Sequence, residues 1–398
     1  MTPGTAPPFR ADHVGSLLRP AELQAARADR AAGRITPEEL RAVEDEAIRD
    51  AVALQQLVGL RSVTDGEFRR ATWHMDFIYQ IGGIDRAPGT LLSTFHNEEG
   101  DITFTPDAIQ VTGPLSVDTT IFGEDFAFLQ SIAGALPSRG DGLPAREAPA
   151  PRSPWPPDPP MVPKLTIPAP SMVHYRSGIR AVVTGDIYPD VESFWSDLGA
   201  AYNVEVQRLA AQGCRYLQLD DTSLAYVNDP SQREYIAARG EDAERIHLQY
   251  ISLTNAAVAG RPADMAITTH LCRGNFQSSW VASGGYDFVA EALFNELDVD
   301  GFFLEFDDER SGGFEPLRFV PPGKQVVLGL VTTKRPELES ADDLKRRIDE
   351  AAKYVPLDQL CLSGQCGFAS TAEGNALTLD DEKAKLSLIV EVAQDVWG

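Results

Sequence analysis

Short apolar runs alternate with amphipathic stretches through residues 164–398. The apolar runs are rich in β-branched and aromatic residues, which is typical of buried strands. They lie at 164–170, 215–221, 266–272, 301–306, 325–331 and 359–366. Apolar residues at helical spacing occupy 190–212, 234–259, 286–296, 340–353 and 379–396. This alternation predicts parallel strands joined by crossover helices.

Two segments near the start of the chain extend the pattern. Residues 10–16 and 61–67 each predict a short strand, which brings the strand–helix units to about eight and favours one (β/α)8 TIM barrel of the α/β class. An open doubly wound sheet is the alternative, but no GxGxxG motif follows a first strand. Residues 36–60 predict a helix that begins with a capping box. Residues 103–113 alternate as antiparallel strands do.

A proline-rich stretch interrupts this pattern at residues 137–163. It has no periodic apolar face, and its composition favours extended, solvated chain. Regular alternation resumes directly after it. We therefore interpret it as a loop insert within a single barrel domain that spans residues 1–398.

Composition and charge narrow the possible partners. No stretch approaches the roughly 20 apolar residues of a membrane-spanning helix, so we expect no membrane partner. The formal net charge of −24 argues against nucleic acid. Four cysteines in 398 residues do not make a disulfide framework, which favours a reducing, cytoplasmic compartment. Residues 1–13 lack a basic region followed by an apolar core, so we expect no secretory signal.

Polar residues collect where the predicted strands end. Barrel enzymes build their active sites at the carboxyl ends of the strands, so these residues are candidates for one site. They are His13, Ser16, Asp65, Glu67, Asp220, Asp221, His270, Cys272, Glu305 and Cys366. His270 and Cys272 stand two positions apart on one strand, and their side chains therefore face the same side.

Four of these residues have the chemistry of zinc ligands. An imidazole, two thiolates and a carboxylate suit Zn²⁺, which accepts mixed nitrogen, sulfur and oxygen donors in a tetrahedral site. They are His270, Cys272, Glu305 and Cys366. Two structural interpretations remain open. Cys366 could be a small buried apolar residue, and Glu305 could form an ion pair with Arg310 or Arg273.

The sequence resembles the cobalamin-independent methionine synthase family, specifically its C-terminal catalytic barrel and related single-barrel proteins. The resemblance covers residues 10–30, 60–80 and 164–398. The matching motifs are HVGS at 13–16, DGEFR at 65–69, QLDD at 218–221, THLC at 269–272, LEF at 304–306 and GQCG at 364–367. The resemblance implies a (β/α)8 barrel and a zinc ion that holds the homocysteine thiol as a thiolate. It assigns the zinc to His270, Cys272, Glu305 and Cys366.

The same resemblance implies contacts with the amino-acid part of homocysteine. Ser16 matches the residue that meets the substrate carboxylate. Glu67 and Asp220 match the carboxylates that hold the substrate ammonium group. Glu305 matches the adjustable ligand, which would give a catalytic zinc its open position.

Other segments depart from the family pattern. The chain has one barrel where the full-length synthase has two, and residues 165–178 lack the folate-site motif. Within 329–340, Lys334 stands nearest the place of the family's proton-donating histidine. A lysine with a lowered pKa can donate a proton, but Lys334 could equally contact an anionic ligand group or be a surface cation. The methyl donor stays open: a methylated folate, a methylcorrinoid on a partner protein, or another methylated compound.

We predict a zinc-dependent thiol methyltransferase that makes methionine from homocysteine. One alternative is zinc-dependent alkyl transfer to another thiol, such as epoxide opening by coenzyme M. Others are a non-catalytic barrel that binds a sulfur amino acid around a structural zinc, and a uroporphyrinogen-type decarboxylase, which would leave the metal residues unexplained. Trp73 and His74 are candidates for the mouth of the site, although their pattern favours packing. We expect residues 307–310 to form a solvated loop and not a second metal site.

Overall fold

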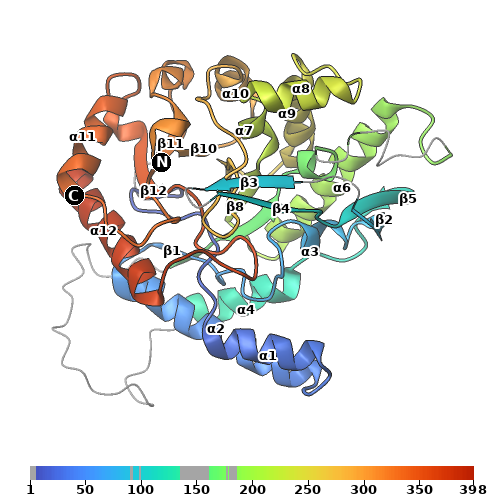
Figure 1. Cartoon of the computed structure of the whole chain (residues 1–398), viewed down its shortest axis with the longest axis horizontal. Helices are drawn as coiled ribbons and strands as arrows, with labels where there is room; N and C mark the ends of the chain where they lie inside the picture. The colour runs from blue at the N-terminus through green and yellow to red at the C-terminus, as the bar shows by residue number, and fades with distance from the viewer. Residues whose placement is uncertain (1–5, 90–92, 98–99, 135–160, 176–177, 179–185) are drawn as a thin grey trace.

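The computed structural model describes residues 6–89, 93–97, 100–134, 161–175, 178 and 186–398. A six-stranded parallel sheet, in the order β12-β11-β10-β9-β8-β7, forms its centre (Figure 1). The strands are β7 (Leu165–Pro168), β8 (Tyr216–Asp221), β9 (Ala266–Leu271), β10 (Gly301–Glu305), β11 (Gln325–Val331) and β12 (Leu360–Gly364). Each lies within one of the six apolar runs, so those strand predictions are confirmed. The chain has an α/β fold.

Two short elements extend the sheet at its edges. β1 (Ser62–Val63) pairs in parallel with β6 (Val162–Pro163), which directly precedes β7. At the other edge, Ala11 forms a parallel bridge with Leu362 of β12. The prediction of strands at 10–16 and 61–67 is therefore wrong in extent. One physical reason is that Gly15, with φ of 150°, leaves the extended conformation that a strand needs.

Helices follow the strands of the sheet. They are α6 (Val191–Ala211), α7 (Ser223–Tyr226), α8 (Pro230–Ala238), α9 (Ile246–Val258), α10 (Ala290–Glu296), α11 (Ala341–Ala351) and α12 (Leu379–Trp397). Single-turn helices are η1 (Pro170–Val173), η2 (Glu309–Ser311), η3 (Glu315–Phe319) and η4 (Leu357–Gln359). The helix predicted over 234–259 is instead divided into α8 and α9. Gly240 follows α8 with φ of 80°, a left-handed conformation that ends a helix.

The N-terminal part contains α1 (Ala21–Ala31), α2 (Pro37–Val58), α3 (Met75–Ile78) and α4 (Gly123–Ala133). The capping box of α2 is confirmed: Glu39 N donates to Thr36 Oγ1 at 3.1 Å, and Thr36 N donates to Glu39 Oε2 at 2.8 Å. Each bond satisfies an amide that the first helical turn leaves unpaired.

Two antiparallel strand pairs lie between α3 and α4. β2 (Gly82–Ala87) pairs with β5 (Ala108–Ser116), and β3 (Ser93–Asn97) pairs with β4 (Gly100–Phe104). The antiparallel prediction for 103–113 is thus confirmed. In Figure 1 the β3–β4 pair crosses the middle of the molecule. Backbone hydrogen bonds between His96 and Trp280, at 2.7 and 2.9 Å, join β3 to the loop after β9.

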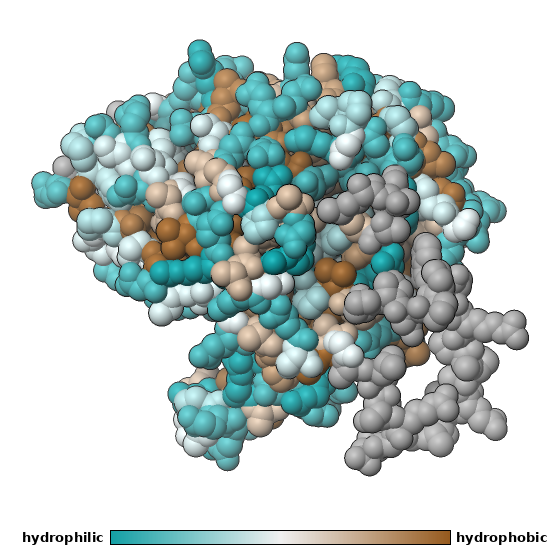
Figure 2. Space-filling view, turned by 180° about the vertical axis from the view of Figure 1, so that it is seen from behind, coloured by the Kyte–Doolittle hydropathy of each residue, from teal (hydrophilic) through white to brown (hydrophobic). Residues whose placement is uncertain are grey.

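Hydrophilic side chains cover much of the face seen in Figure 2. In the described part of the chain, no helix combines the length and apolar character needed to cross a membrane. The proline-rich insert at 137–163 lies almost wholly outside the described residues, and both the insert and the single-domain organisation stay predictions.

Candidate metal centre

Three strand ends bring the four candidate ligands together. His270 lies in β9 and Cys272 just after it, Glu305 ends β10, and Cys366 follows β12. Their ligand atoms all lie within 4.8 Å of one another, and all four residues are buried. Cys366 follows β12, which lies two strands beyond β10 in the sheet. Gly329 of β11 leaves room for the backbone next to Cys366. A Cβ at Gly329 would lie 2.7 Å from Gln365 Cα.

The distances within the cluster are equal to, or somewhat shorter than, those around a tetrahedral metal. Ligands bonded at zinc-like lengths lie about 3.3–3.8 Å apart in a tetrahedron. Cys366 Sγ lies 3.6 Å from His270 Nε2, 3.2 Å from Glu305 Oε1 and 2.9 Å from Cys272 Sγ. The nitrogen, sulfur and oxygen donors present are those that zinc prefers. The residues therefore fit a metal ion of this type.

His270 is oriented by a carboxylate on the neighbouring strand. The register pairs Asp220 with His270, and Nδ1 lies 3.2 Å from Asp220 Oδ1. Burial would lower the pKa of His270, but the hydrogen bond with Asp220 and the negative charges nearby raise it. A carboxylate at Nδ1 leaves Nε2 to face the cluster, as metal-binding histidines require. A bound metal would replace a proton at that atom.

The two thiols differ in their pKa. A hydrogen bond from Cys366 lowers the pKa of Cys272. Burial raises the pKa of Cys366 well above its usual value, and the neighbouring Cys272 and Glu305 add to this effect. Cys272 is therefore the first thiolate of the pair. The thiolate is the form that binds metals.

Glu305 is buried among cations. Burial would raise its pKa, but Lys334, Arg310 and Arg273 lower it to about 2. Arg310 Nη1 lies 3.5 Å from Glu305 Oε2, and Arg273 Nη1 lies 3.8 Å from the same atom. The prediction of a solvated loop at 307–310 is wrong for Arg310 and Asp307, whose side chains are only 9% and 2% exposed, whereas Glu309 is exposed. The sequence left open whether Glu305 pairs with Arg310 or Arg273 or binds a metal; in the structure Glu305 lies beside both arginines and within the candidate ligand cluster.

Lys334 lies on this charged side of the site. It is buried, and Nζ has no hydrogen-bond partner among the described residues. Burial would lower its pKa, but Glu305, Cys366 and Asp307 raise it. A proton-donating role required a lowered pKa, so the surroundings in the structure favour a lasting positive charge instead. The expectation of a surface cation is wrong.

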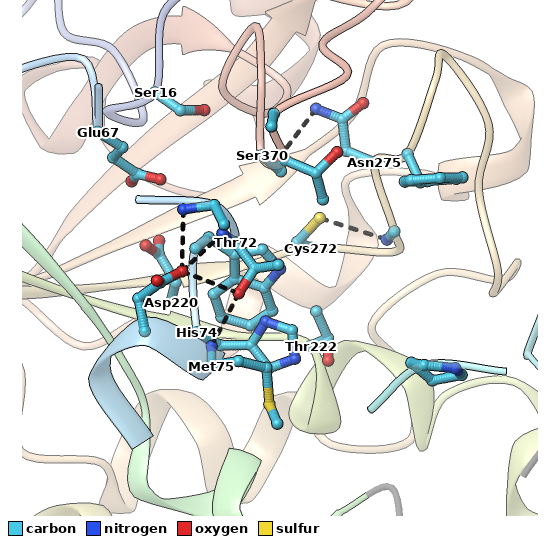
Figure 3. A pocket seen from close by; sticks show the side chains of 18 of the residues that line it. Ser16, Glu67, Thr72, His74, Met75, Asp220, Thr222, Cys272, Asn275 and Ser370 are labelled. Atoms are coloured by element: carbon cyan, nitrogen blue, oxygen red, sulfur yellow. Dashed lines mark hydrogen bonds between the residues drawn. The ribbon is translucent and has the colours of Figure 1, made fainter. Parts of the chain in front are cut away.

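Ser16, Glu67, Asp220 and Asp221 line a cavity of about 570 Å³ beside the cluster, whereas His13 and Asp65 are buried but are not among its lining residues. Figure 3 shows Ser16, Glu67 and Asp220 on one side of it and Cys272 further across. Ser16 Oγ accepts a hydrogen bond from Ala369 N at 3.4 Å. Gln218 Nε2 donates to Asp220 Oδ1 at 2.7 Å, which holds this carboxylate beside His270.

Glu67 has surroundings unlike those of Glu305. Thr166 Oγ1 donates to Oε1 at 2.7 Å, while Oε2 has no hydrogen-bond partner among the described residues. Burial raises the pKa of Glu67 to about 7; Arg70 lowers it in part, and Asp220 raises it further. This corner of the cavity holds a buried carboxyl group whose Oε1 lies 3.7 Å from Arg70 Nη1 and whose Oε2 has no hydrogen-bond partner among the described residues.

Aromatic residues form much of the cavity wall. Those among the lining residues are Trp73, His74, Tyr79, Phe95, Phe104, Tyr226 and Phe276. Phe95 and Phe104 come from the β3–β4 pair and stack at 5.7 Å between ring centroids. The expectation that Trp73 and His74 only pack is incomplete, because both also line the cavity. A flat apolar surface beside polar groups is common in small-molecule sites.

Four buried residues that could hold a metal ion lie at the carboxyl ends of parallel strands, next to a cavity, and define a candidate metal site in an α/β protein. Residues 175–395 match the family model described as the catalytic domain of cobalamin-independent synthase. The Bacillus subtilis protein YxjG is 45% identical over 98% of this chain and 95% of its own. The chain belongs to the cobalamin-independent methionine synthase family.

Solved structures agree with this assignment. One, assigned as a vitamin-B12 independent methionine synthase from Listeria monocytogenes, is 36% identical, covers 99% of both chains and has a TM-score of 0.72. The B12-independent methionine synthase from a Shewanella species, in complex with selenomethionine, is 19% identical over 97% of both chains, with a TM-score of 0.66. The second likeness shows the shared fold alone.

Proposed function

We propose that this protein is a zinc-dependent methyltransferase that converts homocysteine to methionine. One observation carries the proposal: His270 and Cys272 of the four-residue cluster line the same cavity as Glu67 and Asp220. The thiol of one small amino acid could reach the cluster while its ammonium group meets these carboxylates.

We also propose that the sheet closes as a (β/α)8 barrel. This is supported by Ser62 Oγ of β1, which donates to Asp12 Oδ1 at 2.8 Å and so links β1 to the segment that bridges to β12.

Zinc is the metal that the donor set supports. His270 Nε2, the two cysteine sulfurs and Glu305 would hold it, and the bound ion would lower the pKa of the substrate thiol so that it is present as a thiolate. The protein supplies the surrounding charges. Asp220 keeps His270 oriented, and Lys334, Arg310 and Arg273 compensate the negative charge of Glu305.

The amino-acid part of the substrate would lie against the carboxylate corner. Oε2 of Glu67 has no hydrogen-bond partner among the described residues, and an ammonium group there would favour the ionised form of this carboxyl. Asp220 would be the second acceptor, and Ser16 Oγ would meet the substrate carboxylate. These contacts would direct the thiol side of the substrate toward Cys272 and His270, which line the same cavity.

The identity of the methyl donor is a separate part of the proposal. A Bacillus velezensis relative, 21% identical over 89% of this chain, is named 5-methyltetrahydropteroyltriglutamate–homocysteine methyltransferase. The aromatic wall at Trp73, Phe95 and Phe276 could stack on the ring of such a donor. Lys334, through its positive charge, and Glu305 are the two residues for which we propose a catalytic role. A donor carried by a partner protein stays an alternative.

A donor screen tests the activity. Zinc-loaded protein is incubated with L-homocysteine and either 5-methyltetrahydrofolate, its triglutamate form or methylcobalamin, and methionine is measured by mass spectrometry. We expect methionine from at least one donor and none with Cys272→Ser. Faster methylation or alkylation of coenzyme M than of homocysteine would contradict the amino-acid assignment. Glu67 and Asp220 argue against that thiol, since its sulfonate would face two carboxylates.

A further inference from the structure

The two oxygens of Glu305 face chemically different surroundings. Oε1 faces the ligand cluster: Cys366 Sγ lies 3.2 Å away, and Arg273 N donates to it at 3.0 Å. Oε2 faces away from the sulfurs toward Arg310, whose Nη1 lies 3.5 Å away. The Glu305 carboxylate therefore contacts the candidate metal ligands through one oxygen and faces the guanidinium group of Arg310 with the other.

The pair formed by Glu305 and Arg310 is incomplete as it stands. Oε2 of Glu305 and Nε of Arg310 are both buried, and neither has a hydrogen-bond partner in the described part of the chain. Buried polar groups are normally paired. Both groups thus retain an unused interaction, and a small movement of the carboxylate toward Arg310 would bring Glu305 Oε2 within hydrogen-bond distance of Nη1, which now lies 3.5 Å away.

We propose that Arg310 is a positioning residue that receives the Glu305 carboxylate when a thiol substrate takes its place at the metal. This inference rests on the proposed function. Two cysteine thiolates and one carboxylate already exceed the charge of a divalent cation, and a substrate thiolate adds one more negative charge. Displaced Glu305 would then keep its buried charge without the metal, and a buried charge is costly unless a close partner compensates it. Arg310 offers it a partner at the position it would move into.

The surroundings of Arg310 hold it in place for this role. It lies in η2, outside the strands that carry the ligands. Its Nη2 lies 3.4 Å from Asp308 Oδ2 and 3.6 Å from Asp307 Oδ1, and its guanidinium lies 5.1 Å from the centre of the Trp280 ring. Arg273 also faces Glu305, but it directly follows Cys272 in the chain. Arg310 is therefore the cation that can be changed with least disturbance of the ligands.

Two substitutions and one matched control test the proposal. Arg310→Met removes the charge at similar length, and Arg310→Lys keeps it. Arg347→Met is the control: Arg347 Nη2 donates to Phe306 O at 2.8 Å and its guanidinium lies over Phe314, so it supports the same loop from another side. The readouts are zinc content, the dissociation constant for L-homocysteine by calorimetry, and zinc K-edge absorption with and without L-homocysteine.

We expect Arg310→Met to keep its zinc but to bind homocysteine about tenfold more weakly or worse, because a buried charge has lost its partner. Its zinc should retain an oxygen ligand at homocysteine concentrations that saturate the wild type. Arg310→Lys should recover much of the affinity, and Arg347→Met should match the wild type.

The proposal is overturned if Arg310→Met matches the wild type in affinity and spectral change, if it loses its zinc, or if Arg347→Met shows the same defect. A failure of the proposed function looks different. In that case the wild-type spectrum itself does not respond to homocysteine.

Discussion

Glu305 and Glu67 are both buried carboxyl groups in one proposed site, yet their pKa values are shifted in opposite directions. Burial alone would raise both. Lys334, Arg310 and Arg273 lower the pKa of Glu305 to about 2. Glu67 has Arg70 on one side and Asp220 on the other, and its pKa is about 7. The metal corner is therefore charged before any substrate arrives. In the carboxylate corner, Arg70 Nη1 lies 3.7 Å from Glu67 Oε1 and only partly offsets the burial of this carboxyl group. A metal ion suits the first, and an ammonium group suits the second.

Removing a thiolate from the metal corner should have the largest effect. Cys366→Ser should weaken zinc binding by roughly 100- to 1,000-fold. This estimate assumes that one of four ligands contributes about a quarter of the ~10–16 kcal/mol with which a four-ligand site binds zinc. Methionine formation should fall with the zinc content. The measurement is zinc affinity by competition with a chelator.

The matched control for this prediction lies on β12, the strand that leads to Cys366. Cys361 is 1% exposed and packs with Val14, Phe303 and Val327, away from the cluster. Cys361→Ser should keep its zinc. Equal zinc loss in the two variants would show that strand stability, and not metal ligation, explains the effect.

Changing the carboxylate corner should spare the zinc and weaken substrate binding. Glu67→Gln should lower kcat/KM for homocysteine roughly 10- to 100-fold, since a hydrogen bond to a charged group contributes about 1.5–3 kcal/mol. With 4-mercaptobutanoate, a thiol without the amino group, Glu67→Gln and the wild type should behave alike.

Glu205 offers a matched control for Glu67. It is fully buried in α6, and burial raises its pKa to about 7 as well, but it does not line the cavity. Glu205→Gln should leave kcat/KM for homocysteine unchanged. A similar loss in both variants would contradict the assignment of Glu67 to the ammonium group.

The raised pKa of Glu67 predicts a pH dependence. Only the ionised carboxyl can pair with an ammonium group, so kcat/KM for homocysteine should fall about tenfold per pH unit below pH 7, and Glu67→Gln should lack this limb.

The effect of Glu67 on protein stability depends on pH in the opposite direction. The contribution of protonated Glu67 to the free energy of unfolding is present below its ordinary pKa of 4.5 and is lost as the pH rises through about 7. Titrations of activity and of thermal unfolding would test both signs, and a wild-type activity limb that survives in Glu67→Gln would belong to another group.

The smallest effect should come from Ser16. Ser16→Ala removes one neutral donor to the substrate carboxylate, which is worth about 1 kcal/mol, or roughly a fivefold increase in KM. With 3-aminopropanethiol, which lacks the carboxylate, the variant and the wild type should have the same KM. A larger loss with both thiols would indicate that Ser16 supports the fold near Ala369 instead.

The sheet could be predicted from the sequence because its strands are buried on both faces. Such strands are continuous apolar runs, as at 301–306 and 325–331. The N-terminal edge was harder to predict. Only Ser62–Val63 and a bridge at Ala11 are regular there, and side chains such as Asp12 make the remaining links. Local patterns do not encode such links.

The sequence likewise predicts one feature of the candidate site, the positions of the four candidate ligands, and not another, the charges around them. The ligand positions followed from polar residues at strand ends, where i and i+2 spacing and strand order limit the geometry. The electrostatics did not follow, because the charge that Arg310 places beside Glu305 depends on how the loop after β10 folds back. Residues 307–310 look hydrophilic in sequence, yet their arginine points inward. A charged run does not reveal whether its charges face water or a buried partner.

Zinc K-edge absorption of the purified wild-type protein, with and without L-homocysteine, tests the central claim most directly. The account predicts bound zinc with two sulfur ligands from Cys272 and Cys366, and a third sulfur ligand once homocysteine is added. A zinc shell that does not change on adding homocysteine would contradict thiol activation at this site. Protein purified without chelator that binds no zinc would contradict the metal centre itself.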